Sequence, residues 1–285
     1  MCVIKFGPSG NSAAYAEAGF SGSANSAKWV KDMGLDCFEY SFGRGVNLGD
    51  ETAAAIGKKF RDESVELSVH APYYINFANP DDEKAANSYG YVLSTLRAAK
   101  LMGAKRIVFH PAAQGKLTRG EAGELTKKRL ETLATLIEDG GYSDMIVCPE
   151  TMGKQAQIGT VEEIAEFVNV APFYYPCVDF GHVNAREGGI LKRKEDFLKV
   201  FDDIERISGK DKLEKLHVHF SKIEYTKKGE VRHLTFEDEV YGPDYKPFLE
   251  AVKERGLKPY IICESAGTQD IDAKAMKEYL SLIHI

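Results

Sequence analysis

The 285-residue sequence predicts an α/β fold, a single (β/α)8 TIM barrel that spans residues 1–285 with its active site at the carboxyl ends of the strands. Short runs rich in β-branched and aromatic residues alternate with amphipathic stretches, which is the pattern of βα units and a parallel sheet. These runs number eight, as a barrel of about 250 residues requires. No Gly-, Pro- or Ser-rich linker divides the chain, so we expect one domain.

The expected strands are residues 2–6, 36–40, 67–71, 106–110, 145–150, 175–180, 215–220 and 260–265. The segments between them, such as 23–34, 82–103 and 160–170, resemble helices, and several open on Ser, Asp or Thr and close before Gly, as helix caps do. A doubly wound sheet is the second choice. It would need a glycine-rich phosphate loop after the first strand, and FGPSGNSA at 6–13 does not have the G-x-G-x-x-G spacing.

The composition is that of an ordinary globular protein, with 44% hydrophobic and 28% charged residues. A net charge of −6 argues against holding nucleic acid by bulk electrostatics, because such binding uses cations to neutralise phosphates. We expect no membrane partner and a cytoplasmic location, since no apolar run could span a bilayer and no signal-peptide layout is present. The cysteines are odd in number and contain no C-x-x-C pair, which indicates buried reduced thiols: Cys2, Cys37, Cys148, Cys177 and Cys263.

The strand ends carry most of the chain's histidines and several carboxylates. Six of the eight strands end on or near His70, His110, Glu150, Asp179 with His182, His217 with His219, and Glu264. Closing the strands into a barrel would bring these residues to one mouth, and of the seven histidines only His284 lies outside the strand ends and the loops after them. Carboxylates gathered there would repel one another without a cation, and a histidine and carboxylate set suits zinc, manganese or iron rather than magnesium.

Two histidines on the seventh strand, His217 and His219, point to the same face because side chains alternate with period two. They could bind one metal ion, bind two, or fill the core. Cys148 and Cys177 each lie two residues before an expected carboxylate ligand, one layer deeper in the barrel. They could be soft ligands, but we favour core packing because a buried thiol needs no partner.

Seven motifs, in this order and strand placement, resemble endonuclease IV, the zinc-dependent apurinic/apyrimidinic endonuclease family of the xylose-isomerase-like barrels. The motifs are HAPYYIN (70–76), FHP (109–111), PET (149–151), VDFGH (178–182), LHVHFSK (216–222), VRH (231–233) and ESAG (264–267). The resemblance covers nearly the whole chain. It implies a monomeric DNA-repair enzyme that binds damaged double-stranded DNA and hydrolyses the phosphodiester 5′ to an abasic site.

The resemblance also implies a cluster of two or three Zn²⁺ ions, for which Mn²⁺ or Fe²⁺ are alternatives on ligand chemistry. The ligands implied for the first ion are His70, His110 and a shared Glu150. Those for the second are the same glutamate with Asp179, His217 and Glu264. A third ion would take His182 and His233, and Glu150 and Glu264 are the expected catalytic residues.

The third site departs from the family pattern. The family has a D-R-H triplet there, and this sequence has Val231-Arg232-His233, whose valine cannot ligate. We hypothesise that His219 or Glu230 completes the site.

The resemblance implies that Tyr73, Tyr74 and Arg44 enter the DNA duplex at the lesion. Aromatic rings can fill the gap left by a missing base and stack on its neighbours. Ordinary loop packing explains the two tyrosines equally well.

Two other functions stay open. A sugar isomerase or epimerase of the same superfamily would need one metal ion, held by the four ligands of the second site, with two carboxylates as acid and base. The histidines that it does not need favour the nuclease: His70, His110, His182 and His233. The other alternative is a metal-bound barrel that only binds damaged DNA.

Overall fold

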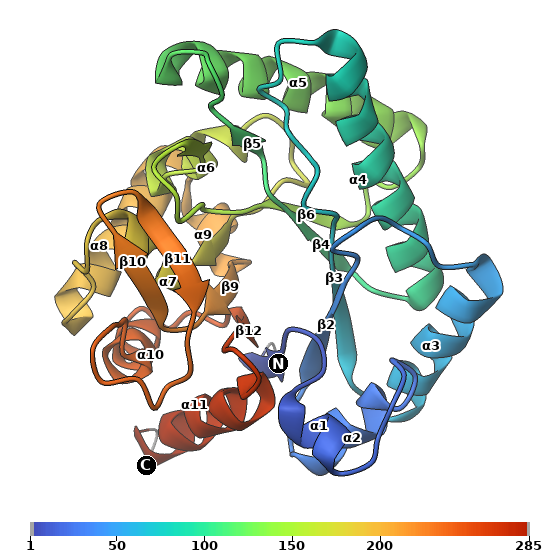
Figure 1. The fold of residues 1–285 in the computed structure, drawn as a ribbon, viewed down its shortest axis with the longest axis vertical. Helices are drawn as coiled ribbons and strands as arrows, with labels where there is room; N and C mark the ends of the chain where they lie inside the picture. The colour runs from blue at the N-terminus through green and yellow to red at the C-terminus, as the bar shows by residue number, and fades with distance from the viewer. Residues whose placement is uncertain (1–2, 284–285) are drawn as a thin grey trace.

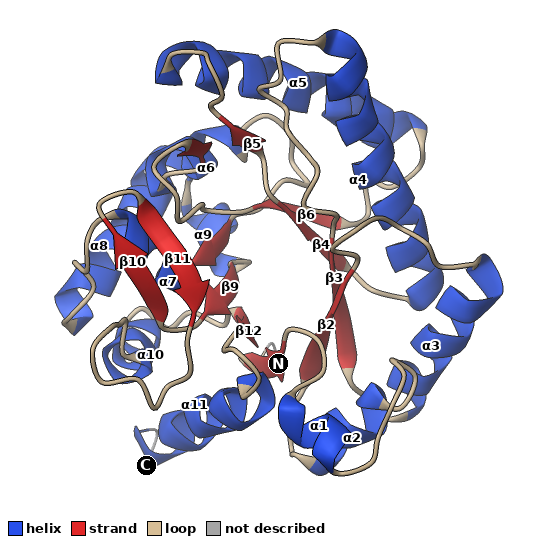
Figure 2. Ribbon diagram, in the orientation of Figure 1, coloured by secondary structure: helices blue, strands red, loops and turns tan. Residues whose placement is uncertain are grey.

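Eight parallel strands close into a barrel in the computed structural model of the protein, which describes residues 3–283 (Figures 1 and 2). The barrel strands are β1 (Lys5–Pro8), β2 (Cys37–Ser41), β3 (Glu66–His70), β4 (Arg106–Phe109), β6 (Ile146–Pro149), β8 (Cys177–Asp179), β9 (His217–Phe220) and β12 (Tyr260–Cys263). They pair in the orders β2-β3-β4-β6 and β1-β12-β9-β8. Single parallel bridges, Ser9 with Glu39 and Glu150 with Cys177, join the two sheets and complete the ring.

The predicted fold class is confirmed, and each predicted strand region overlaps a barrel strand. The first strand is displaced from its expected place, since it runs from Lys5 to Pro8 instead of over 2–6. This strand, β1, pairs in parallel with β12, with Lys5 opposite Tyr260, and the pairing fixes where β1 begins. Cys2 and His284 lie outside the described residues.

The helices form the outer ring around the strands (Figure 2). They are α1 (Ala13–Glu17), α2 (Ser26–Asp32), α3 (Asp50–Asp62), α4 (Asp82–Met102), α5 (Arg119–Asp139), α6 (Val161–Phe167), α7 (Phe180–Arg186), α8 (Lys194–Ser208), α9 (Lys210–Glu214), α10 (Tyr245–Glu254) and α11 (Gln269–Ile283). The expected caps are present on α4, where the Asp81 carboxylate accepts from two backbone N–H groups at the start and Gly103 adopts φ 77° at the end.

Four short strands outside the barrel were not predicted. β5 (Ala112–Ala113) pairs antiparallel with β7 (Gln157–Ile158). β10 (Ile223–Thr226) and β11 (Gly229–His233) form a hairpin directly after β9. Their sequences are too short and too polar to show the period of a buried strand.

The β10–β11 hairpin lies over one side of the barrel mouth (Figure 1) and contacts the loop after β6. Glu230 donates its backbone N–H to the Gly153 carbonyl at 3.0 Å. A Cβ added at Gly153 would lie 2.7 Å from the Glu230 Cβ, so glycine is required for this close approach. The contact fixes where the β11 side chains enter the mouth.

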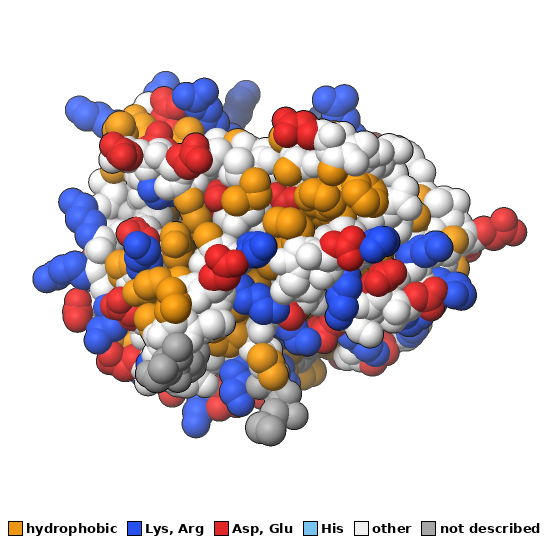
Figure 3. Space-filling model, turned by 90° about the horizontal axis from the view of Figure 1, so that it is seen from below, with side chains coloured by type: hydrophobic (Ala, Val, Ile, Leu, Met, Phe, Trp, Pro, Cys, Tyr) orange, Lys and Arg blue, Asp and Glu red, His pale blue; other side chains and the backbone are white. Residues whose placement is uncertain are grey.

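The surface and the cysteines agree with the composition. Lys and Arg side chains are interspersed with Asp and Glu on the side of the barrel shown in Figure 3. Within the described residues, no helix is long and apolar enough to cross a membrane. The predicted buried reduced thiols are confirmed for Cys37, Cys148, Cys177 and Cys263.

Candidate metal centre

The barrel mouth gathers ligand-type side chains from the ends of six strands. Their positions follow from parallel pairing, which places the carboxyl ends of all strands at one rim. Three groups of His, Asp and Glu lie there, each with ligand atoms within 4.8 Å of one another. We call these three groups together the mouth layer.

The first group holds His70, His110 and Glu150. The Nε2 atoms of His70 and His110 lie 3.2 and 3.1 Å from the same oxygen, Oε2 of Glu150. His70 Nδ1 lies 2.8 Å from the Ala71 carbonyl, which can only accept, so Nδ1 carries the proton and donates. With Nδ1 held in this way, Nε2 faces Glu150 Oε2 and is the nitrogen that would ligate a metal ion, as a backbone partner commonly arranges.

The second group holds Glu150, Asp179, His219 and Glu264. His219 Nδ1 lies 2.9 Å from Glu150 Oε1 and 3.6 Å from Glu264 Oε1. Asp179 Oδ1 accepts the His182 backbone N–H at 2.8 Å. Its other oxygen, Oδ2, is buried without a hydrogen-bond partner in the described part of the chain. A buried carboxylate oxygen without a donor is costly unless a cation satisfies it, so this donor set fits a metal ion.

The expected ligand from the seventh strand must be corrected. The sequence indicated His217, and the structure places His219 in the second group instead. The reason is the register of β8 and β9, which sets Asp179 beside His219 and Cys177 beside His217. His217 therefore lies one layer deeper, fully buried, with Nε2 3.2 Å from Glu39 Oε2.

The third group holds His182, Glu230 and His233. His182 Nδ1 donates to the Thr151 carbonyl at 2.9 Å, and its Nε2 lies 3.5 Å from Glu230 Oε2. His233 Nδ1 lies 2.9 Å from Ser221 Oγ. Of the two residues expected as alternatives, Glu230 is therefore the one that lies here, and His219 belongs to the second group.

Val231 does not face the third group. Val231 is 47% exposed as a residue, whereas the Glu230 side chain is 14% exposed and lines the cavity at the mouth. Val231 is the unpaired residue of a bulge in the hairpin, because Tyr225 pairs with Glu230 and Glu224 with Arg232. This bulge lets both Glu230 and His233 face the third group.

Burial and neighbouring charges shift the pKa values of the mouth carboxylates Glu150 and Asp179 in opposite directions. Burial opposes ionisation of Glu150, but the charges of His219 and His110 outweigh it and hold the pKa of Glu150 well below its ordinary value. Burial raises the pKa of Asp179, with His182 opposing it. Burial disfavours the charged form of His182, but Asp179 and Glu230 outweigh it and raise its pKa to about 9. The metal-free mouth therefore carries a bound proton at His182 near neutral pH.

A cavity of about 340 Å³ opens onto the mouth layer. Its lining residues are His70, Tyr73, His110, Met152, Lys154, Gln157, His182, Glu230, His233 and Glu264. Lys154 and Gln157 were not expected there, since the sequence gives no periodicity in the loop after β6. Glu39 was also missed, although a carboxylate inside the apolar run DCFEY was a usable signal.

The three residues expected to contact DNA lie at the rim in different settings. The Tyr73 ring stacks on His110, with centroids 5.3 Å apart and planes at 27°, and it is 56% exposed. Tyr74 is not among the residues that line the cavity, and its ring centroid lies 6.1 Å from that of Tyr91. Arg44 is exposed in the turn after β2, whose Gly43 carbonyl accepts the Tyr73 backbone N–H at 3.1 Å.

Comparison with known proteins gives the family and the fold. Residues 27–283 match the family described as xylose isomerase-like TIM barrel. An uncharacterized protein of Methanocaldococcus jannaschii is 30% identical over 258 residues, which covers 89% of this chain and 90% of that protein. A probable endonuclease 4 of Aquifex aeolicus is 26% identical over 206 residues, which covers 69% of this chain and 71% of that protein.

Two solved structures with different activities in their names resemble the barrel to a similar degree. A D-tagatose 3-epimerase-like protein has a TM-score of 0.74 at 18% identity and covers 99% of this chain and 98% of its own. Endonuclease IV from Thermus thermophilus has a TM-score of 0.69 at 18% identity, with 98% and 99% covered. At this identity the likeness establishes the fold alone.

Proposed function

Because the chain belongs to the xylose isomerase-like TIM barrel family, we propose that it is a metal-dependent endonuclease of DNA repair, which hydrolyses the phosphodiester 5′ to an abasic site in double-stranded DNA. The observation that carries this proposal is the presence of three ligand groups at one mouth. A sugar epimerase of this fold needs only the group around Glu150, Asp179, His219 and Glu264. The other two groups would have no use in such an enzyme.

The donor chemistry supports zinc, with manganese or iron as alternatives. Each group combines imidazole with carboxylate, which suits these ions better than magnesium or calcium. The orphaned Asp179 Oδ2 and the inward-facing Nε2 of His70, 3.2 Å from Glu150 Oε2, agree with ligation. When bound, such ions activate water and stabilise the leaving oxygen of a phosphodiester.

Glu150 links the groups because its two oxygens face different partners. Oε2 contacts His70 and His110, and Oε1 contacts His219 at 2.9 Å and His182 Nδ1 at 3.5 Å. In the proposed reaction Glu150 holds the mouth layer in one geometry. Glu264 is 17% exposed and lines the cavity, so it is placed to accept a proton from the attacking water.

The rest of the cavity suits a phosphate group on a damaged strand. Lys154 is an exposed cation on the cavity wall, where it would attract the substrate phosphate. Tyr73 offers an aromatic face above His110 for an unpaired neighbour of the lesion. Arg44 and Tyr74, which lie farther out, would contact the flanking duplex.

A mononuclear sugar epimerase is the second candidate. It is favoured by the second group, which is by itself a complete set of four ligands with two carboxylates open to acid and base roles. His233 distinguishes the two, because it lies in the third group and outside the second.

The test is cleavage of a duplex carrying one tetrahydrofuran abasic analogue, with and without a chelator, beside turnover of ketohexoses. We expect chelator-sensitive cutting that leaves a 3′-hydroxyl. His233→Gln should abolish it, and Arg232→Gln, an exposed neighbour on β11, should not. Tight binding without cutting would indicate a protein that only binds lesions. Ketohexose turnover that survives His233→Gln, without cutting, would overturn the proposal in favour of the epimerase.

A further inference from the structure

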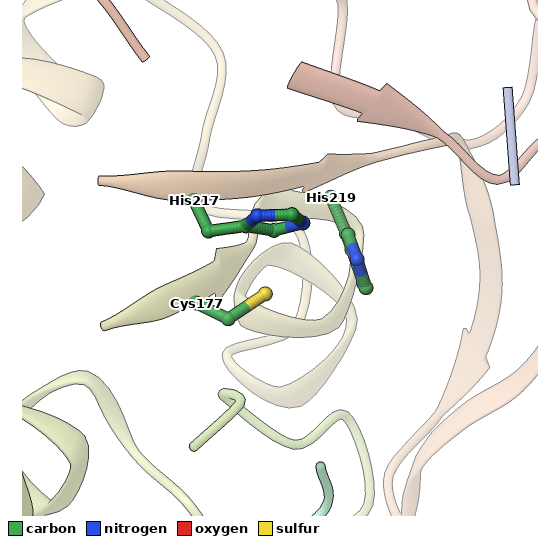
Figure 4. Close-up of side chains that lie close together, drawn as sticks. All are labelled: Cys177, His217 and His219. Atoms are coloured by element: carbon green, nitrogen blue, oxygen red, sulfur yellow. The ribbon is translucent and has the colours of Figure 1, made fainter. Parts of the chain in front are cut away.

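A second set of ligand-type side chains lies beneath the mouth layer, in the closed interior of the barrel. Cys177 on β8 and His217 and His219 on β9 place ligand atoms within 4.8 Å of one another. Figure 4 shows the Cys177 sulfur and the two imidazole rings pointing into the same space. All three residues are fully buried.

Glu39 on β2 joins these three residues from across the barrel. Its Oε1 lies 2.9 Å from His219 Nε2, and its Oε2 lies 3.2 Å from His217 Nε2. Ser68 donates a hydrogen bond to Oε2 at 2.8 Å. We call Glu39, Cys177, His217 and His219 the deep cluster.

Hydrogen bonds within the protein do not satisfy all the buried polar atoms of the deep cluster. Four buried polar atoms of the deep cluster have no hydrogen-bond partner of acceptable geometry within residues 3–283: Nδ1 and Nε2 of His217, Nε2 of His219 and Oε1 of Glu39. The histidine nitrogens nevertheless lie about 3 Å from the Glu39 oxygens. Ring N–H groups lie in the ring plane, so short contacts with poor angles mean that the donors are not aimed at the oxygens. An orphaned buried polar group costs about 1–3 kcal/mol, and four in one place would be a heavy penalty.

We propose that the deep cluster binds a zinc ion. Thiolate and imidazole are donors that Zn²⁺ accepts, and Cys177, His217 and His219 supply them from one group. Glu39, whose oxygens lie 2.9 and 3.2 Å from the two imidazole rings, would be the fourth ligand of a closed structural site. The Cys177 thiol loses its proton on binding, and the thiolate together with the Glu39 carboxylate cancels the charge of a divalent ion. The site ties β2 to β8 and β9 across the barrel, and it does not depend on which reaction the mouth performs.

His219 belongs to both layers and connects them. Its Nδ1 faces Glu150 and Glu264 at the mouth, and its Nε2 faces Glu39 below. If both sites were filled, His219 would offer Nε2 to the deep cluster and Nδ1 to the second mouth group, and its ring N–H proton would be lost to solvent as the metal binds. Loss of the deep ion therefore weakens, but does not abolish, metal binding in the second mouth group.

Cobalt substitution tests the proposal because Co²⁺ bound to a thiolate shows a sulfur-to-metal charge-transfer band in the near ultraviolet. The mouth groups contain only nitrogen and oxygen ligands, so this band reports the deep cluster alone. We expect the band in the Co²⁺-loaded wild-type protein and in Cys148→Ser. Cys148 is the matched control, since it is a buried thiol on β6 outside the ligand group.

Cys177→Ser should lose the band and bind one metal equivalent fewer by mass spectrometry, with an unchanged far-ultraviolet circular dichroism spectrum as the folding control. A wild-type protein fully loaded at the mouth that shows no charge-transfer band would overturn the proposal without any variant. A band that survives in Cys177→Ser would overturn it as well. Neither measurement involves DNA cleavage, so failure here leaves the proposed nuclease untouched.

Discussion

The mouth layer and the deep cluster use the same kinds of side chain but differ in their access to solvent. Mouth residues such as His110, Glu230 and Glu264 are partly exposed and line a cavity of about 340 Å³. Glu39, Cys177, His217 and His219 are completely buried. The mouth layer therefore has members that can exchange ligands with a substrate, whereas the deep cluster, which shares His219 with it, has no exposed member.

Glu150→Gln should produce the largest effect, because this carboxylate contacts histidines of all three mouth groups. Loss of the shared ligand removes several kcal/mol of transition-state stabilisation, so the rate of abasic-site cleavage should fall by roughly 10³-fold or more. The cobalt–thiolate band of the deep cluster should remain. Glu166→Gln on α6 is the control. Glu166 is exposed, so this change should alter neither the cleavage rate nor the cobalt–thiolate band. Loss of the band in Glu150→Gln would show that the two layers are not separable.

Without bound metal, protonation of His182 should stabilise the folded state at low pH and not at high pH. Its folded pKa is raised to about 9 from an ordinary 6.5, so its stabilising contribution is complete below pH about 6.5 and is lost as pH rises through about 9. A shift of one pKa unit corresponds to about 1.4 kcal/mol. In EDTA, the free energy of unfolding of His182→Gln should therefore lie up to about 3 kcal/mol below that of the wild type at pH 6 and almost equal it at pH 10. Chemical denaturation at the two pH values measures this difference.

His110→Gln is the matched control for that experiment. Burial lowers the pKa of His110, although Glu150 opposes this, so its protonation adds no stability at low pH. An equal loss at pH 6 and pH 10 in His182→Gln would contradict the expected bound proton.

The third mouth group should depend on Glu230 and not on position 231. Glu230→Gln removes an anionic ligand and should weaken metal binding in that group by about 10- to 100-fold, the range seen when one metal-supporting group is lost. Val231→Asp places a carboxylate on the exposed face of β11 and should leave the metal content unchanged. Metal titration of both variants measures this. A gain of metal in Val231→Asp would mean that the hairpin can shift by one residue and turn position 231 into the third group.

The sequence was sufficient for the barrel because each strand is a short, mainly apolar run between amphipathic segments, a pattern that local composition carries. The sequence did not show how deep in the barrel each inward-facing side chain lies. His217 and His219 are indistinguishable by period, and only the β8–β9 register, which pairs Asp179 with His219, shows which one reaches the mouth. Glu39 was missed for a related reason, since its partners come from the opposite side of the barrel.

The smallest effects are expected for Tyr73 and Tyr74, which lie at the outer rim of the mouth layer. Tyr73 stacks on His110 above the cavity, so Tyr73→Leu removes a stacking surface worth about 1–3 kcal/mol to an unpaired base. We expect KM for the abasic duplex to rise by about 10-fold, with little change in kcat and an unaltered cobalt–thiolate band. Tyr74→Leu, a matched change of a residue that lies outside the cavity, should raise KM by less than about threefold. Equal effects from the two variants would mean that the rim binds DNA without using the metal cavity, and access to the mouth layer would then not explain how the substrate is selected.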